Sequence, residues 1–134
     1  MRDVFADTFH FLALLNPRDR QHDRATEIAN EGDLEIFTTR AVLLEVADAF
    51  AHPSTRMIAA EFLDALAADV SVTILELTEA LYHRGLALYR DRPDKSWSLT
   101  DCVSFVVMDD RGLSEALTGD HHFAQAGFIP LLAP

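Results

Sequence analysis

Short apolar segments alternate with longer helical patterns along this chain, and that alternation restricts the fold more than any other feature of the sequence. The segments carry β-branched and aromatic residues, as is typical of buried strands. They comprise 3–7, 34–38, 70–75, 115–118 and 128–132. The helical patterns comprise 8–15, 22–31, 39–50, 54–68, 78–89 and 100–110. Strands that alternate with helices predict an α/β fold with a mostly parallel central sheet of about five strands, flanked by helices.

The length of 134 residues suits one domain with a single core. No apolar run approaches the roughly 20 residues that a membrane span needs, and no signal-peptide pattern opens the chain. The lone cysteine, Cys102, has no partner for an internal disulfide. These features predict a cytoplasmic protein with no membrane association.

The formal net charge of −11 argues against a polyanionic partner, because affinity for nucleic acid grows with the number of phosphates that Lys and Arg neutralise. Two details weaken that argument. All the basic residues except Lys95 are arginines, which suit bidentate phosphate contacts. Acids gathered around a bound metal ion would also have part of their charge cancelled. A nucleic-acid substrate therefore stays open.

Two acids follow strand-like segments: Asp7 ends 3–7, and Asp120 comes shortly after 115–118. In open parallel sheets, ligands bind beyond the carboxyl ends of the strands. Two further acids interrupt apolar helical runs. Glu45 lies among small apolar residues in TTRAVLLEVADAF, and Asp101 lies in the first turn after the candidate cap Ser98. Carboxylates in such places are costly unless positive charge compensates them, and a divalent metal ion is the simplest compensation.

Each acid taken singly also has a structural explanation. Asp101 suits the positive end of a helix dipole, and Asp7 and Asp120 suit turns or caps before helices. Glu45 is the hardest to explain in this way, because polar neighbours are scarce around it. The combination of the four acids favours a metal site that binds Mg²⁺ or Mn²⁺, which prefer oxygen ligands.

Other reactive residue types are interpreted as structural. Cys102 is interpreted as a small apolar residue of a buried helix, His10 as a satisfied core histidine, and His121-His122 as solvated loop residues. The sequence has no phosphate-binding glycine loop, no Gly-x-Ser-x-Gly elbow and no Cys-x-x-Cys pair.

The chain resembles the PIN-domain ribonucleases, and among them the VapC-type toxins of bacterial toxin–antitoxin pairs. The resemblance covers essentially the whole chain, residues 1–134, as a single PIN-like nuclease domain. Four blocks carry it: FADTFHFLALLNPRDRQH, TTRAVLLEVADAF, SLTDCVSFVVM and EALTGDHHFAQAGF.

The resemblance implies a metal-dependent endoribonuclease whose acidic quartet is Asp7, Glu45, Asp101 and Asp120, with Thr118 beside the fourth acid and Ser104 as a weaker neighbour. It also implies a homodimer and a small antitoxin protein as partner, with antitoxin contact on the helices between Thr39 and Ala68. Two positions depart from the family pattern. Phe9 stands where Ser is common, and Gly119 before Asp120 predicts a more flexible loop.

Two other functions remain open at this stage. The acidic net charge is compatible with a PIN-fold binding module without catalysis, and the acids are compatible with a metal-dependent phosphatase. For an RNA substrate, the candidates for phosphate contacts are Arg18, Arg20, Arg40 and Arg92.

Overall fold

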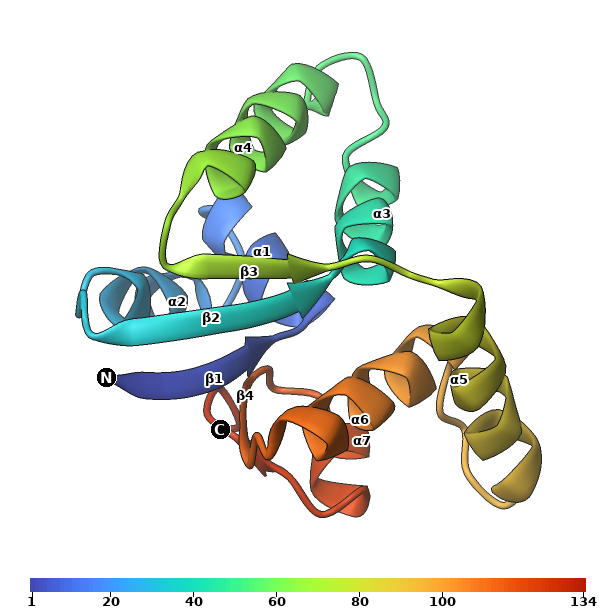
Figure 1. Cartoon of the computed structure of the whole chain (residues 1–134). Coiled ribbons are helices and arrows are strands. Elements are labelled where there is room, and N and C mark those ends of the chain that lie inside the picture. Colours follow the sequence, from blue (N-terminus) through green and yellow to red (C-terminus); the bar gives the residue numbers. More distant parts are fainter.

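The computed structural model describes residues 1–134 and contains one five-stranded sheet (Figure 1). The strands are β1 (Arg2–Ala6), β2 (Leu34–Thr39), β3 (Val72–Leu75), β4 (Glu115–Leu117) and β5 (Ile129–Pro130). They lie in the order β3-β2-β1-β4-β5, and every neighbouring pair is parallel. The predicted α/β fold with a parallel central sheet is confirmed.

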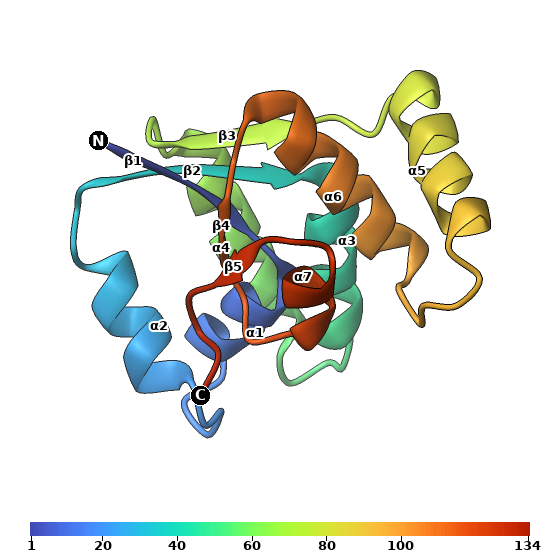
Figure 2. The same cartoon turned by 90° about the horizontal axis from the view of Figure 1, so that it is seen from below.

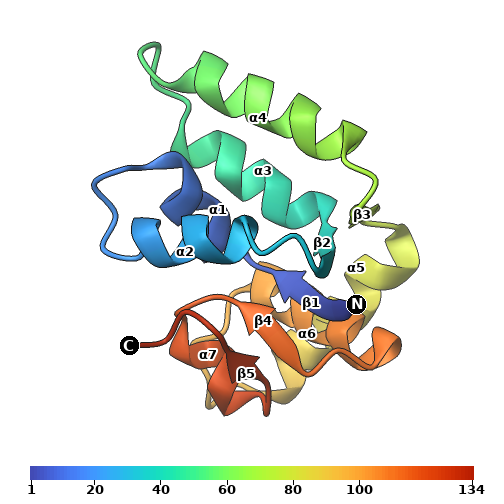
Figure 3. The same ribbon diagram turned by 90° about the vertical axis from the view of Figure 1, so that its left-hand side faces the viewer.

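Seven helices cover the two faces of this sheet. They are α1 (Thr8–Leu15), α2 (His22–Ala29), α3 (Arg40–Ala49), α4 (Arg56–Ala68), α5 (Glu79–Asp91), α6 (Leu99–Arg111) and α7 (His121–Gln125). Helices α1 to α4 lie on one side of the sheet and α5 to α7 on the other (Figures 1 and 3). None of the helices has both the length and the apolar character that crossing a bilayer requires.

Six of these helices match the predicted ones to within a few residues, but the prediction of a loop at His121-His122 was wrong. These residues open α7, a single short helical turn that starts directly after Asp120. A five-residue helix is too short to show the apolar periodicity by which longer helices are recognised. Its formation depends on packing, since Phe123 is fully buried.

The strand order places a topological switch between β1 and β4. From β1 the chain builds β2 and β3 on one side, then returns through α5 and α6 to add β4 and β5 on the other side. Loops that leave β1 and β4 therefore diverge to opposite faces of the sheet, and in open parallel sheets this point of the carboxyl edge is where the ligand-binding crevice lies. Asp7 follows β1 and Thr118 follows β4, so both lie at this crevice.

A cluster of aromatic rings fixes α6 and α7 against each other. The ring of Phe105 meets those of Phe123 and Trp97 edge to face, with centroids 4.9 and 5.0 Å apart. Phe5 of β1 lies 6.4 Å from Phe123. Burying one such ring stabilises the fold by about 1.5–3 kcal/mol, and each edge-to-face pair adds about 0.5–1.5 kcal/mol. This packing holds the starts of α6 and α7 close to the end of β1.

Helix α5 stands at the outer side of α6, away from the sheet (Figure 2). Gly85, the one buried residue of α5, allows the close approach. A Cβ atom at position 85 would lie 2.6 Å from Cγ2 of Val103, which is closer than two carbon atoms approach without strain. This close packing of α5 on α6 keeps the loop that joins the two helices near the start of α6.

Candidate functional site

The carboxylate of Asp7 is the most deeply buried acid at the carboxyl edge of the sheet, with 5% of the residue exposed. Asp7 occupies the N-cap position of α1 but makes no side-chain capping bond there. Its Oδ2 atom instead accepts a 2.9 Å hydrogen bond from Oγ1 of Thr118, across the switch between β1 and β4. A capping role therefore does not account for the presence of an acid at position 7. Thr118, which the resemblance placed beside Asp120, also bonds to Asp7.

Burial and like charge make the ionised form of Asp7 unfavourable. The pKa of Asp7 is raised to about 7, chiefly by removal from water and further by the nearby carboxylates of Asp101 and Asp120, against the hydrogen bonds from Thr118 and the Thr8 backbone, which lower it. The fold brings these three acids near one another, since Thr118 bonds to Asp7 and to the Asp120 backbone, and His122 contacts both Asp101 and Asp120. A bound cation would favour the ionised form of all three.

Asp101 lies at the start of α6, as the structural explanation predicted, and it also contacts His122. It forms a capping box with Ser98, because the Ser98 hydroxyl accepts from the Asp101 N–H and Asp101 Oδ2 accepts from the Ser98 N–H. The same Oδ2 atom lies 3.1 Å from Nδ1 of His122. The capping box thus fixes the carboxylate at the crevice without using up its oxygen atoms.

Asp120 lies at the N-cap of α7, and its Oδ1 atom accepts a 2.9 Å hydrogen bond from the His122 N–H. Its own N–H donates to Oγ1 of Thr118, over 3.1 Å. Thr118 therefore bonds at once to the side chain of Asp7 and to the backbone of Asp120. One buried hydroxyl links two of the four predicted acids.

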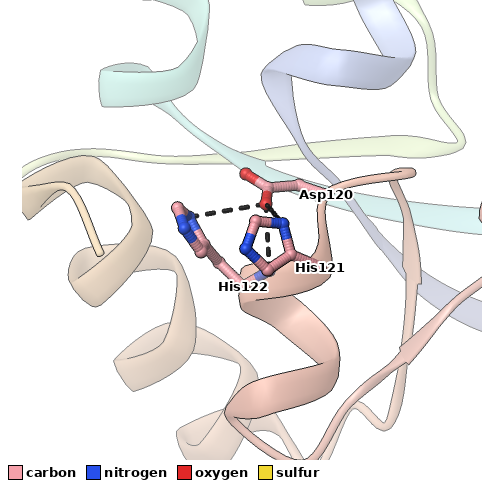
Figure 4. Close-up of side chains that lie close together, drawn as sticks. All are labelled: Asp120, His121 and His122. Atoms are coloured by element: carbon pink, nitrogen blue, oxygen red, sulfur yellow. Dashed lines mark hydrogen bonds and ion pairs between the residues drawn. The ribbon is translucent and has the colours of Figure 1, made fainter. Parts of the chain in front are cut away.

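His122 belongs to this site, and its interpretation as a solvated surface residue was wrong. Its side chain is 17% exposed, and Nδ1 lies 3.4 Å from Asp120 Oδ1 in addition to its contact with Asp101. Its Nε2 atom lies 3.2 Å from the Ser96 hydroxyl. Figure 4 shows His121 and His122 around Asp120, and the ligand atoms of these three residues lie within 4.8 Å of one another. The sequence signal that was available is the placement of a histidine two residues after a helix-capping acid.

Glu45 lies at the margin of the site. It is half-buried on α3, and its Oε1 atom accepts a 2.6 Å hydrogen bond from Oγ1 of Thr8, the residue after Asp7. No hydrogen bond or ion pair joins Glu45 to the other three acids. Ser104, expected as a weaker neighbour, is buried and donates to the carbonyl of Thr100 in its own helix. The structure therefore gives Ser104 a role in the backbone of α6 only.

The donor set fits a hard divalent cation. Shared partners, Thr118 and His122, link the three carboxylates, no Lys or Arg forms an ion pair with any of the four acids, and the imidazoles beside them are those of His121 and His122. Carboxylate oxygens are the ligands that Mg²⁺ and Mn²⁺ prefer, whereas imidazole suits softer ions. Asp7, Asp101 and Asp120 are accordingly the candidate ligands for such an ion, although the group of side chains whose ligand atoms all lie within 4.8 Å of one another is Asp120, His121 and His122.

Phe9 and Gly119, the two departures from the family pattern, contact each other. A Cβ atom at position 119 would lie 2.5 Å from Cζ of Phe9 and 3.1 Å from the carbonyl oxygen of Leu132. Gly119 has no positive φ angle. The absent side chain therefore makes room for the Phe9 ring, and the interpretation of Gly119 as a source of loop flexibility has no support in the structure.

The two remaining reactive residue types are buried. Removal from water raises the pKa of the Cys102 thiol to about 11, which disfavours the nucleophilic thiolate. His10 is 1% exposed, as predicted for a core residue, but its Nδ1 atom has no hydrogen-bond partner. The expectation that its polar atoms are satisfied was wrong.

Comparison with known proteins agrees with this fold. The sequence model of the PIN domain family matches residues 4–129. No curated protein sequence matches the chain significantly. Among solved structures, VapC20 of Mycobacterium tuberculosis, described as a sarcin-ricin loop cleaving toxin, is 25% identical, with a TM-score of 0.85 over 94% of this chain and 96% of that one.

Two more distant structures share the fold. VapBC2 of Rickettsia felis, solved with a DNA fragment from its promoter, is 12% identical, with a TM-score of 0.67 over 95% of this chain and 96% of that one. FitAcB of Neisseria gonorrhoeae is 16% identical, with a TM-score of 0.66 over 95% of this chain and 94% of that one. The resemblance to VapC-type PIN domains inferred from the sequence blocks is confirmed. This chain belongs to the PIN domain family.

Proposed function

We propose that this protein is a Mg²⁺- or Mn²⁺-dependent endoribonuclease that hydrolyses RNA phosphodiester bonds as the toxin of a toxin–antitoxin pair. The observation that carries the proposal is the buried carboxylate of Asp7, which shares a crevice with Asp101 and Asp120 and has no basic side chain beside it. In this proposal residues 1–134 form one nuclease domain that works in the cytoplasm.

The proposed metal ligands are Asp7, Asp101 and Asp120, with Glu45 binding directly or through a water molecule. A divalent ion bound there would lower the pKa of a water molecule and stabilise negative charge on the phosphodiester. Glu45 would orient the attacking water, since it lies at the margin of the site with its Oε1 atom bonded to the hydroxyl of Thr8, the residue after Asp7. Metal-ligating carboxylates depend on the hydrogen bonds that orient them, which here are the Thr118 bond to Asp7 and the capping box of Asp101.

The choice of RNA and partners rests on the relatives. VapC20 is described as cleaving the sarcin-ricin loop, so that loop is the first RNA to test. VapBC2 supports the proposal that this chain also pairs with a small antitoxin, and the family resemblance supports a homodimer. A short gene that overlaps the start of this one and encodes a protein that copurifies with the chain would test the antitoxin partner directly.

Incubation of the purified protein with a sarcin-ricin hairpin and with an unstructured RNA tests the activity. We expect cleavage with Mn²⁺ or Mg²⁺ and none in EDTA. Asp101→Asn should abolish cleavage, whereas Asp109→Asn, the same change at an exposed position of the same helix, should not. Wild-type cleavage by Asp101→Asn would show that the site is wrongly assigned.

Two outcomes would favour the alternative functions. Hydrolysis of small phosphoesters with RNA left intact would indicate a metal-dependent phosphatase. An absence of divalent-ion binding in calorimetry, together with intact RNA, would indicate a binding module without catalysis.

A further inference from the structure

A cavity of about 510 Å³ lies between the end of α5 and the start of α6 and is lined by cations without any acid. Arg90, Arg92 and Lys95 contribute to its wall, and Lys95 is the only lysine of the chain. The volume lies in the range of cavities that hold small ligands. In a protein with a net charge of −11, such a concentration of positive charge is a local exception.

Other arginine-lined cavities of the molecule contain acids as well. The cavity beside α5 and β3 combines Arg84 with Asp110, which form an ion pair. The cavity beside α1 and α2 combines Arg18 and Arg20 with Asp19. Of these three cavities, the one at the α5–α6 loop is the one with no carboxylate in its wall, although Asp94 pairs with Arg92 beside it.

The arginine at the centre of this cavity is held in place. The guanidinium of Arg92 lies 5.1 Å from the centroid of the Trp97 ring, and its Nε and Nη2 atoms donate to Asp94, each over 3.0 Å. Its Nη1 atom donates to no protein group. Arg90 forms no ion pair, and Lys95 approaches Asp94 only to 4.0 Å. Several donors thus remain for an anionic ligand.

The cavity lies next to the acidic site, because two residues of its wall form hydrogen bonds to residues of that site. Ser98 lines the cavity and forms the capping box that fixes Asp101. Ser96 also lines it, and its hydroxyl lies 3.2 Å from Nε2 of His122. Two residues of the cavity wall are therefore in hydrogen-bond contact with two residues of the crevice. These contacts place the cavity beside the acids, so an RNA strand lying across the acids would extend toward Arg90, Arg92 and Lys95.

We propose that this cavity binds a backbone phosphate of the RNA strand next to the bond that is cleaved. The inference rests on the proposed ribonuclease function and adds a substrate-binding subsite to it. Such a subsite would offset the repulsion expected from the acidic composition, because Arg90 and Lys95, beside the Asp94-paired Arg92, attract a polyanion that the molecule as a whole repels. Tyr89, which is 49% exposed at the same cavity, offers a ring on which a base can stack.

The test is the affinity of the full chain for a fluorescein-labelled single-stranded RNA, measured by fluorescence anisotropy in EDTA so that no cleavage occurs. The variant Arg90→Gln/Lys95→Gln removes two charges and leaves the Arg92–Asp94 pair intact. For single strands the loss of one phosphate contact lowers the steepness of log K against log salt by about 0.7, which weakens binding about 5-fold at 0.1 M salt.

Arg24→Gln/Arg56→Gln is the matched control, since it removes the same charge from exposed positions of α2 and α4. We expect it to bind RNA within about twofold of wild type, and Arg90→Lys/Lys95→Arg to retain wild-type affinity. An equal loss of RNA affinity in Arg90→Gln/Lys95→Gln and in the control would overturn the inference, because the effect would then come from net charge alone. Full affinity of the first variant would overturn it as well.

Two further measurements separate this inference from the proposed function. If the subsite exists and the ribonuclease assignment is right, Arg90→Gln/Lys95→Gln raises KM for RNA with little change in kcat. Loss of RNA affinity in a protein that cleaves no RNA would refute the ribonuclease and leave an RNA-binding cavity. Competition by inorganic phosphate is the second measurement. If millimolar phosphate displaced the labelled RNA as effectively as unlabelled RNA does, the cavity would be a site for free phosphate, and the assignment to an RNA strand would be overturned.

Discussion

Thr118 Oγ1 donates a 2.9 Å hydrogen bond to Oδ2 of Asp7, although 111 residues separate the two in the sequence. The bond crosses from the end of β4 to the end of β1, the two strands between which the topology switches. It is fully shielded from water, since Thr118 is 0% and Asp7 5% exposed. This single contact orients the acid on which the proposed metal site depends.

Replacement of Thr118 by Val should lower kcat/KM for RNA by about 10- to 100-fold, the usual cost of losing a group that orients a metal ligand. The Thr118 bond lowers the pKa of Asp7, so its loss should raise that pKa and shift the acidic limb of the pH–rate profile to higher pH. Thr118→Ser retains the hydroxyl and should restore both. A Thr118→Val enzyme with an unshifted profile would contradict this role.

The metal-free protein should lose stability as pH rises toward neutrality. The pKa of Asp7 is raised from 3.8 to about 7 in the folded chain. The stabilising contribution of its protonated form is therefore complete below about pH 4 and is lost as pH rises through about 7. Thermal melts in EDTA between pH 5 and 8 should show a falling Tm for wild type.

Asp7→Asn, which is neutral at every pH, should melt at a higher temperature than wild type at pH 8 in EDTA and should show a flatter pH dependence. Asp64→Asn, on the exposed side of α4, should leave the wild-type pH dependence unchanged. Parallel Tm curves for wild type and Asp7→Asn would rule out a strained Asp7 carboxylate. Saturating Mn²⁺ should abolish the advantage of Asp7→Asn, because the ion favours the ionised form.

Gly119→Ala should destabilise the fold by about 1–3 kcal/mol, the usual cost of overpacking, because its Cβ atom would overlap the Phe9 ring. Phe9→Ser should relieve that overlap, so the double variant should be less destabilised than the sum of the two single variants. Urea unfolding of the four proteins measures this coupling. Strict additivity would show that the two positions do not depend on each other.

His10→Leu should stabilise the protein, because it removes a buried polar atom that has no partner. Burial lowers the pKa of His10 from 6.5 to about 4. The stability that its neutral form contributes is present above pH 6.5 and is lost as pH falls through about 4. The difference in Tm between His10→Leu and wild type should therefore widen from pH 7 to pH 4. A constant difference would contradict the depressed pKa.

Local patterns predicted the elements well because they depend on neighbouring residues. Each strand is recognised by a run of β-branched and aromatic residues, and each long helix by its apolar periodicity. The capping box of Ser98 and Asp101 is also local, since it spans four residues. The positions of Asp7 and Asp120 at element ends follow from the same local evidence. Helix α7 escaped prediction because its short turn is stabilised by the burial of Phe123 against distant rings.

The sequence alone thus determined the α/β class, the family resemblance and the four acids as candidates. Only the tertiary structure decided that β1 lies beside β4, since strand pairing joins residues more than a hundred positions apart and leaves no trace in local periodicity. Because these strands are adjacent, Asp7 accepts a hydrogen bond from Thr118 and the Phe9 ring packs against Gly119. The same arrangement places His122 in contact with both Asp101 and Asp120. The sequence specifies which side chains are present, but tertiary packing decides which of them come into contact at the site.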